Sequence, residues 1–256
     1  MNYDIFLLVR LSSSRLPNKA MKKINNKHII EYLINRLEQT KKTRNLIICT
    51  TDQKSDDPLI SFLEEKNIKY FRGSEHDILI RLQDAAISYQ SDFMVVVDGD
   101  DIYTDPYFVD RIIDEYEKTN ADFITSDGFP HGFIPVGIAR NALEKICKIK
   151  VSSNTETGYR EFFTQTNLFN CTYIKPEEDM KFNKKLRLTL DYEEDYQLAQ
   201  KIFSALDNNF HLKDILTLFE KDPNLLKIIE NVDEKWKKYF GNNVTDLTLK
   251  FTEEKK

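Results

Sequence analysis

Basic and hydroxyl-bearing residues gather in a short stretch near the start of the chain. Residues 10–19 hold three consecutive serines and the cations Arg10, Arg15 and Lys19. They follow residues 5–9, a continuously apolar run that is typical of a strand buried on both faces. A cationic, hydroxyl-rich loop after such a strand is where α/β proteins bind phosphate, because N–H groups, hydroxyls and cations stabilise its oxygens. We interpret the stretch as a triphosphate-binding loop. A basic surface turn is the alternative, since the chain has no Walker or Gly-x-Gly-x-x-Gly motif.

A second group of candidate residues is a cluster of carboxylates after a predicted strand. Asp98, Asp100 and Asp101, here called the acid cluster, follow the buried strand predicted over residues 92–97. Carboxylates this close repel each other unless a cation or strong hydrogen-bond donors compensate. Mg²⁺ takes carboxylate oxygens together with substrate phosphates, so the acid cluster is a candidate metal site beside the triphosphate. An acidic solvated turn is the alternative.

Two further aspartates can be explained either as helix caps or as site residues. Apolar and polar residues alternate over residues 186–190, which predicts a strand. Asp191 stands at the end of this strand, before a helix. Asp191 with Glu194 three residues later fits a helix N-cap with a capping box. This is compatible with metal binding, because capping leaves one carboxylate oxygen free. Asp77 likewise fits a simple turn and the cap of the helix that follows it.

The candidate residues lie on a chain whose apolar pattern predicts strands that alternate with helices. Strands are predicted over residues 5–9, 45–51, 68–71, 92–97 and 121–126, with helices between them. This alternation predicts an α/β protein, a three-layer α/β/α fold around a mostly parallel, Rossmann-like sheet. Residues 133–183 alternate less regularly, and we expect a small β-rich arm there. We treat residues 1–230 as a single domain and residues 231–256 as a charged C-terminal tail.

Composition restricts the functional class. The 256 residues carry a formal net charge of -5, which argues against a nucleic-acid surface, because such binding relies on excess Lys and Arg. No apolar run approaches the roughly 20 residues of a membrane-spanning helix, and the N-terminus lacks signal-peptide features. Cys49, Cys147 and Cys171 are widely spaced and odd in number, which suits reduced thiols. We therefore expect a cytoplasmic protein with no nucleic-acid and no membrane partner.

The stretch 10–19 reads Arg-x-x-Ser-Ser-Arg-Leu-Pro-x-Lys, which resembles the opening signature of the CTP-dependent cytidylyltransferases that activate acidic sugars. It is most similar to the spore-coat polysaccharide branch and more distantly similar to the KDO and acylneuraminate enzymes. Three later motifs fit in order: Arg-Gly-Ser-x-x-Asp at 72–77, Gly-Asp-x-x-x-x-Asp-Pro at 99–106 and Arg-x-Thr-x-Asp at 187–191. The resemblance covers roughly residues 3–230. It departs at Ser12 and Asn18, where the family usually has Gly.

The resemblance implies a nucleotidyltransferase that transfers CMP from CTP to an acidic sugar or related acceptor and releases pyrophosphate, in surface polysaccharide or glycan precursor synthesis. It implies Mg²⁺ held by Asp100 and Asp191, with Arg15 and Lys19 as further catalytic residues that stabilise phosphate charge. The candidate nucleotide-binding residues, in chain order, are Arg10, Ser13, Ser14, Arg15, Lys19, Thr50, Arg72, Ser74 and Asp77. A homodimer formed through the arm at 133–183 is implied by the resemblance alone.

The acceptor side departs from the family pattern. Ile134 and Val136 stand where the family's Pro-x-Gly-x-Asp-x-Glu segment has acids, and Phe162 replaces the His of its Arg-Glu-His-Val-Thr segment. Loss of these groups changes which polar groups of a substrate can be satisfied. A sugar-phosphate or phosphonate nucleotidyltransferase, a glycosyltransferase and a non-catalytic nucleotide-binding homologue therefore stay open. The candidate acceptor-binding residues are His131, Tyr159 and Arg160.

Overall fold

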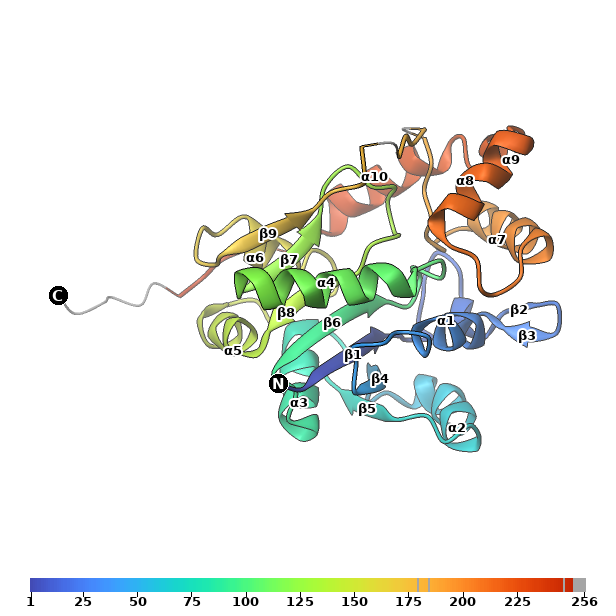
Figure 1. Cartoon of the computed structure of the whole chain (residues 1–256). Helices are drawn as coiled ribbons and strands as arrows, with labels where there is room; N and C mark the ends of the chain where they lie inside the picture. The colour runs from blue at the N-terminus through green and yellow to red at the C-terminus, as the bar shows by residue number, and fades with distance from the viewer. Residues whose placement is uncertain (179, 184, 246, 251–256) are drawn as a thin grey trace.

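Seven strands form the central sheet of the computed structural model, which describes residues 1–178, 180–183, 185–245 and 247–250. The strands are β1 (Tyr3–Leu8), β4 (Asn45–Thr51), β5 (Tyr70–Gly73), β6 (Phe93–Asp98), β7 (Phe123–Ser126), β8 (Val136–Ala139) and β9 (Cys171–Ile174). Their order in space is β5-β4-β1-β6-β8-β7-β9 (Figure 1), and β8 alone of these seven runs against the others. The predicted mostly parallel sheet is confirmed.

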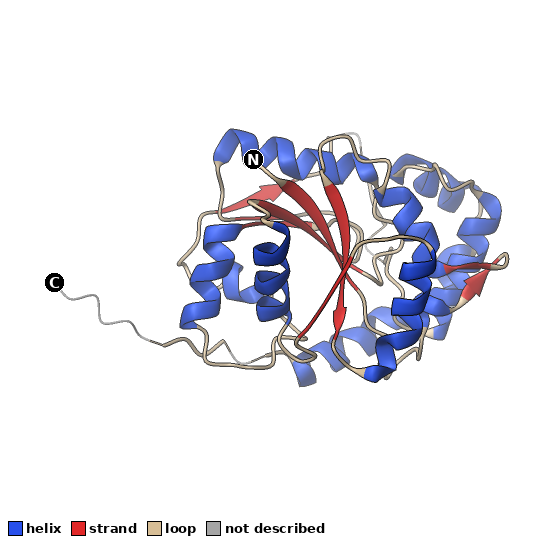
Figure 2. Ribbon diagram, turned by 90° about the horizontal axis from the view of Figure 1, so that it is seen from below, coloured by secondary structure: helices blue, strands red, loops and turns tan. Residues whose placement is uncertain are grey.

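Helices cover both faces of this sheet. On one face α1 (Ile29–Leu37) lies beside α4 (Pro106–Thr119), and on the other α3 (Ile78–Tyr89) packs against α5 (Arg140–Ile149) (Figures 1 and 2). The predicted three-layer α/β/α architecture is therefore confirmed. The remaining helical segments are η1 (Lys19–Met21), η2 (Lys54–Asp56), α2 (Asp57–Glu65), α6 (Glu161–Thr164), α7 (Glu193–Ala205), α8 (Leu212–Lys221), α9 (Leu225–Ile228) and α10 (Val232–Asn243).

The two central strands bring the candidate loop and the acid cluster to one edge of the sheet. β1 lies between β4 and β6 and is apolar and buried from Ile5 onward, and Leu8 at its end pairs in register with Asp98 at the end of β6. Because the strands are parallel, the segments that follow them leave at the same edge. Gly99 permits a close passage there, since a Cβ at Gly99 would lie 2.6 Å from the Leu8 carbonyl oxygen.

The small β element lies elsewhere than the sequence suggested. β2 (Lys23–Ile24) and β3 (Lys27–His28) form a separate two-stranded antiparallel sheet. Residues 133–183 instead contribute β8, α5, α6 and β9 to the main body of the molecule. All four residues of β8 are buried, so this strand belongs inside the sheet rather than on an arm. Dimerisation through residues 133–183 stays a prediction.

Residues 186–190 are buried but do not form a strand, so that prediction is wrong. The Leu188 N–H donates to the His131 carbonyl at 2.7 Å, and the Leu190 N–H donates to the Asp100 carbonyl at 2.9 Å. Arg187 forms only an isolated bridge, with His131. The N–H groups of this extended segment thus bond irregular loops instead of a strand, and the segment carries Asp191 towards the acid cluster.

The charged tail predicted for residues 231–256 is wrong over the length of α10. Val232, Trp236, Tyr239 and Phe240 recur at helical spacing and share one face of this helix. Residues 251–256, the end of the predicted tail, lie outside the described residues. No helix in the described part of the chain is long and apolar enough to span a bilayer.

Candidate active site

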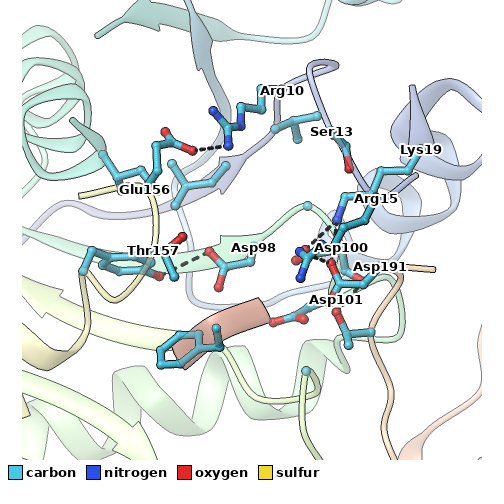
Figure 3. A pocket seen from close by; sticks show the side chains of 18 of the residues that line it. Arg10, Ser13, Arg15, Lys19, Asp98, Asp100, Asp101, Glu156, Thr157 and Asp191 are labelled. Atoms are coloured by element: carbon cyan, nitrogen blue, oxygen red, sulfur yellow. Dashed lines mark hydrogen bonds and ion pairs between the residues drawn. The ribbon is translucent and has the colours of Figure 1, made fainter. Parts of the chain in front are cut away.

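A cavity of about 410 Å³ opens at the sheet edge where β1 and β6 end (Figure 3). Its walls come from the loop after β1, the acid cluster, residues 156–161, Asp191 and α10. Ten of the residues predicted from the sequence line it: Arg10, Ser13, Ser14, Arg15, Lys19, Asp100, His131, Tyr159, Arg160 and Asp191. The fold therefore brings the cationic loop and both proposed metal ligands to one place.

The loop after β1 folds back on itself, because two of its N–H groups bond the carbonyl of Leu11. The N–H groups of Ser13 and Asn18 both donate to the Leu11 carbonyl, at 2.9 and 3.2 Å. Asn18 adopts a left-handed conformation with φ of 53°. Gly suits such a φ best and Asn is among the side chains that tolerate it, so Asn18 preserves a turn where the family pattern has Gly. Lys19 follows directly and points into the cavity.

The Lys19 ammonium lies between two aspartates that come from distant segments. Its Nζ is 2.7 Å from Asp100 Oδ2 and 3.1 Å from Asp191 Oδ1 (Figure 3). Burial lowers the pKa of Lys19, but the two carboxylates outweigh it and raise that pKa. At Asp100, burial raises the pKa, and the attraction of Lys19 outweighs it and lowers the pKa to about 2. Asp100 is therefore ionised at neutral pH.

This pair of carboxylates fits a divalent cation that is bound together with phosphate. Asp100 and Asp191 already flank one positive charge, and carboxylate oxygens are ligands for Mg²⁺. Among the described residues no three or more His, Cys, Asp or Glu side chains are arranged to hold a metal. The remaining ligands of a cation at this position would therefore be phosphate oxygens and water, which is how Mg²⁺ is commonly bound.

Asp191 does not cap the helix that follows it, so the capping hypothesis is wrong by one residue. Tyr192 is the N-cap of α7, and the Asp195 carboxylate accepts from the N–H groups of Asp191 and Tyr192 at 2.9 and 3.0 Å. The Asp191 carboxylate instead accepts from Arg15 at 2.6 Å and from Arg187 at 3.1 Å. Asp195 satisfies the start of the helix, so both Asp191 oxygens face cations.

The other two aspartates of the acid cluster lie beside Arg160. Asp98 accepts a hydrogen bond from Arg160 Nη2 and another from the Tyr159 hydroxyl, the latter at 3.3 Å. Burial raises the pKa of Asp98 although Arg160 opposes it. Burial, followed by repulsion from Asp100 and Asp98, raises the pKa of Asp101 well above its usual range. Carboxyls with raised pKa values that line a cavity are candidates for proton transfer, a role that the sequence analysis did not assign.

His131 belongs to an aromatic contact with α10. Its ring centroid is 4.1 Å from that of Trp236, with the planes 80° apart. Burial, and then the charge of Arg187, lowers the pKa of His131 to about 4, so the ring is neutral at pH 7. The next residue, Gly132, has φ of 78°, and a Cβ there would lie 2.9 Å from Asp101 Oδ1. Glycine is needed where this segment passes the acid cluster.

Four predicted nucleotide-binding residues do not line the cavity: Thr50, Arg72, Ser74 and Asp77. The Thr50 hydroxyl donates to Asp56 Oδ2 at 2.9 Å, and Asp56 Oδ1 accepts from the N–H of Leu11 at 2.8 Å. Thr50 therefore supports the base of the cationic loop. The Arg72 guanidinium is likewise engaged, with its Nε donating to the Thr51 carbonyl at 3.0 Å. Nucleotide contact by these residues therefore stays a prediction, and the contacts of Thr50 and Arg72 within the chain already account for their side chains.

Asp77 and Ser74 build the start of α3. Asp77 Oδ1 accepts from the N–H of Ile80 at 3.2 Å, as an N-cap does, and its carboxylate also pairs with the Lys150 ammonium. The Ser74 hydroxyl accepts from the N–H of Asp77 at 3.2 Å. The simple turn and cap, which was the alternative for this motif, accounts for both side chains.

The cavity also contains residues that no motif indicated. The Glu156 carboxylate bridges Arg10 at 2.8 Å and Arg81 at 2.7 Å, and Arg81 is almost fully buried. No local pattern marks Glu156, because its partners come from remote segments. The aromatic residues of α10 had a signal in their helical spacing. Those that line the cavity are Trp236, Tyr239 and Phe240.

A mostly parallel α/β sheet whose carboxyl edge presents a cationic loop to paired aspartates has the architecture of a nucleotidyltransferase. The cytidylyltransferase family model matches residues 5–227, and the chain belongs to this family. An uncharacterized protein of Methanocaldococcus jannaschii is 31% identical, over 88% of this chain and 93% of its own. The spore coat polysaccharide biosynthesis protein SpsF of Bacillus subtilis is 24% identical, over 87% of this chain and 96% of its own.

Several solved structures share the architecture of this chain. A cytidylyltransferase from Leptospira borgpetersenii is similar with a TM-score of 0.80 and 27% identity, covering 88% of this chain and 97% of its own. A CMP:2-keto-3-deoxy-manno-octonic acid synthetase complexed with CTP shares the fold, with a TM-score of 0.60 and 12% identity over 80% and 99% of the chains. A manganese complex of Rv0371c from Mycobacterium tuberculosis shares it with a TM-score of 0.56 and 13% identity, over 78% and 97%.

Proposed function

We propose that this protein transfers CMP from CTP to an acidic sugar or related acceptor and releases pyrophosphate, in the synthesis of surface polysaccharide or glycan precursors. The observation that carries the proposal is the convergence of Lys19 with Asp100 and Asp191 in one cavity. A cationic loop and two remote carboxylates are the groups needed to bind a triphosphate with a divalent cation. The relatives SpsF and the CMP:2-keto-3-deoxy-manno-octonic acid synthetase support the choice of cytosine nucleotide and of acceptor class.

The charge of the cavity supports the involvement of a divalent cation. Its lining contains five cationic and six acidic side chains, and the cations are already paired with the acids. A triphosphate that entered alone would add further negative charge. Mg²⁺ held by Asp100 and Asp191 would offset this charge and polarise the α-phosphate towards attack. The manganese complex of a structural neighbour supports a divalent cation at this fold.

The chain's own cations act on the leaving group. In the proposed reaction an acceptor oxygen attacks the α-phosphorus, the bond from that phosphorus to the bridging oxygen breaks, and pyrophosphate leaves. Arg15 and Lys19 exchange their contacts with Asp191 and Asp100 for the β- and γ-phosphates, where they stabilise the charge that develops. Arg10, Ser13 and Ser14 line the same wall and supply further donors to the phosphates.

The acceptor would lie against Arg160 and the raised-pKa carboxyls. The Arg160 guanidinium borders Asp98 and Asp101, and Tyr159 and His131 line the same part of the wall. A guanidinium fork fits a sugar carboxylate, and Asp98 or Asp101 in its ionised form can accept the proton of the attacking hydroxyl. A guanidinium fits phosphate equally well, so a sugar-phosphate acceptor is the second candidate.

Pyrophosphate release tests this proposal. CTP, UTP, GTP and ATP are each incubated with Mg²⁺, the protein and a panel of acidic sugars and sugar phosphates. We expect release with CTP and an acidic sugar, and its loss in Asp100→Asn. Release with sugar phosphates alone would transfer the proposal to the second candidate. Sugar transfer from a preformed nucleotide sugar without pyrophosphate would indicate a glycosyltransferase, and no reaction with any pair would indicate a non-catalytic homologue.

A further inference from the structure

Helix α10 lies outside the segment that the family model matches, yet it forms a wall of the cavity. The match ends at residue 227, and α10 spans Val232–Asn243. Only Val232 of this helix is buried, whereas Trp236, Tyr239 and Phe240 stay partly exposed and line the cavity. Core packing alone does not explain three aromatic side chains in this position.

The aromatic face of α10 contacts a residue of the triphosphate loop. The Arg15 guanidinium lies 4.3 Å from the ring centroid of Tyr239 and 5.5 Å from that of Tyr192. Its Nη2 atom donates to Asp191 Oδ1 at 2.6 Å. The two rings can keep the guanidinium in place when its contact with Asp191 is exchanged for phosphate, and Tyr239 makes the closer of the two cation–π contacts.

Polar contacts hold the helix near both of its ends. Near its start, the Lys235 ammonium pairs with Glu194 of α7. After its end, the Thr245 N–H and hydroxyl donate to the carbonyl of Thr157, at 2.9 and 2.6 Å. Thr157 itself lines the cavity, so the position of α10 is set by the same wall that receives the ligand.

We propose that α10 completes the triphosphate site and that Tyr239 is a positioning residue that orients Arg15; this rests on the proposed function. An arginine that rotates freely loses side-chain entropy when a phosphate orders it. A guanidinium already held by an aromatic ring loses less, so the nucleotide binds more tightly. Tyr239 touches no reacting atom and acts through Arg15 alone.

Calorimetric titration with CTP and Mg²⁺, without acceptor, tests this inference on the full chain. We expect Tyr239→Leu to raise the Kd for CTP about 5- to 30-fold, and Tyr239→Phe, which keeps the ring, to stay within about twofold of the wild type. Tyr107→Leu is the matched control, because Tyr107 forms a surface cation–π pair with Arg111 at 5.8 Å and does not line the cavity. We expect it to leave the Kd unchanged.

A double-mutant cycle separates positioning from a general structural effect. In the Arg15→Met background, Tyr239→Leu should change the Kd by less than about twofold, because the group that it positions is gone. An unchanged Kd in Tyr239→Leu, or an equal loss with and without Arg15, would overturn the inference. A wild-type protein that binds no CTP would instead refute the proposed function, so the two failures are distinguishable.

Discussion

The two walls of the cavity differ in how the chain builds them. The N-terminal wall, residues 10–19 and the acid cluster, consists of groups that directly follow the adjacent strands β1 and β6. The C-terminal wall, residues 131–132, 156–161 and 236–240, is assembled from loops and one helix that are remote in sequence. Cationic side chains dominate the loop of the first wall. Aromatic rings and Arg160, which is paired with Asp98, dominate the second. Groups at strand ends are fixed by the sheet, whereas the second wall depends on tertiary packing.

Asp100→Asn gives the largest expected effect and tests the N-terminal wall. Removing the charge of one proposed metal ligand while keeping the shape of the side chain should lower CTP-dependent pyrophosphate release by at least about 100-fold. Steady-state kinetics, with circular dichroism to verify the fold, makes the measurement. Asp52→Asn, on the exposed surface after β4, is the control and should retain its activity. Equal turnover in wild type and Asp100→Asn would break the distinction between the walls.

His131→Asn tests the C-terminal wall through the pH dependence of stability. The folded pKa of His131 is about 4, below the ordinary 6.5, so between these values the unfolded chain binds more protons. Wild-type stability should therefore fall as the pH drops from about 6.5 to 4, by up to about 3 kcal/mol from this group. Buried acids with raised pKa values, such as Asp101, change the stability with pH in the opposite sense. They are present in both the wild type and His131→Asn.

The difference between the two proteins isolates the histidine. Urea unfolding at several pH values should show a smaller loss in His131→Asn than in the wild type. An equal loss of stability with falling pH in the two proteins would mean that the ring is not held neutral by the packing of Trp236 and its other neighbours.

Arg160→Lys gives a smaller effect that separates the two walls kinetically. Lysine keeps the charge but loses the planar fork that binds carboxylate or phosphate at two points. We expect the KM for the acceptor to rise by roughly tenfold, with the KM for CTP nearly constant. Initial rates with either substrate varied provide the test. An increase in the KM for CTP instead would place Arg160 in the nucleotide site.

Arg72→Gln gives the smallest expected effect on activity. The guanidinium of Arg72 binds the carbonyls of Thr51 and Gln53 and does not line the cavity. We expect the KM for CTP to change by less than about twofold, with a loss of stability of about 1 kcal/mol from the broken hydrogen bonds. A large increase in the KM for CTP would instead show that Arg72 belongs to the nucleotide site.

The sequence was sufficient to predict five of the seven strands of the sheet and most of the N-terminal wall, whereas β8 and β9 lie in the stretch where a separate arm was expected. Continuous apolar runs identified β1, β4 and β6, and parallel strands bring their ends together, so Lys19 and Asp100 could be expected to meet. Asp191 could be placed only by its motif. Its supporting segment is not a strand, and its N–H groups bond the loop carbonyls of His131 and Asp100.

The C-terminal wall was predicted only in part: the candidates His131, Tyr159 and Arg160 line it, but its other residues had no local pattern that identified them. Glu156 has a role only because Arg10 and Arg81 converge on it from other segments. The helical spacing of Trp236, Tyr239 and Phe240 was present but was outweighed by the surrounding charges. Arg72 shows the converse case, in which a motif position is used to support the fold while the sequence pattern suggested a ligand contact.

The most direct test of the central claim is the position of a metal ion in crystals grown with CTP and Mn²⁺, located by its anomalous scattering. The proposal predicts one Mn²⁺ within coordination distance of both Asp100 and Asp191, bound to phosphate oxygens of the nucleotide, with Lys19 displaced onto the β- or γ-phosphate. A nucleotide bound with the Lys19 ammonium still between the two carboxylates, or a metal ion bound elsewhere, would contradict it.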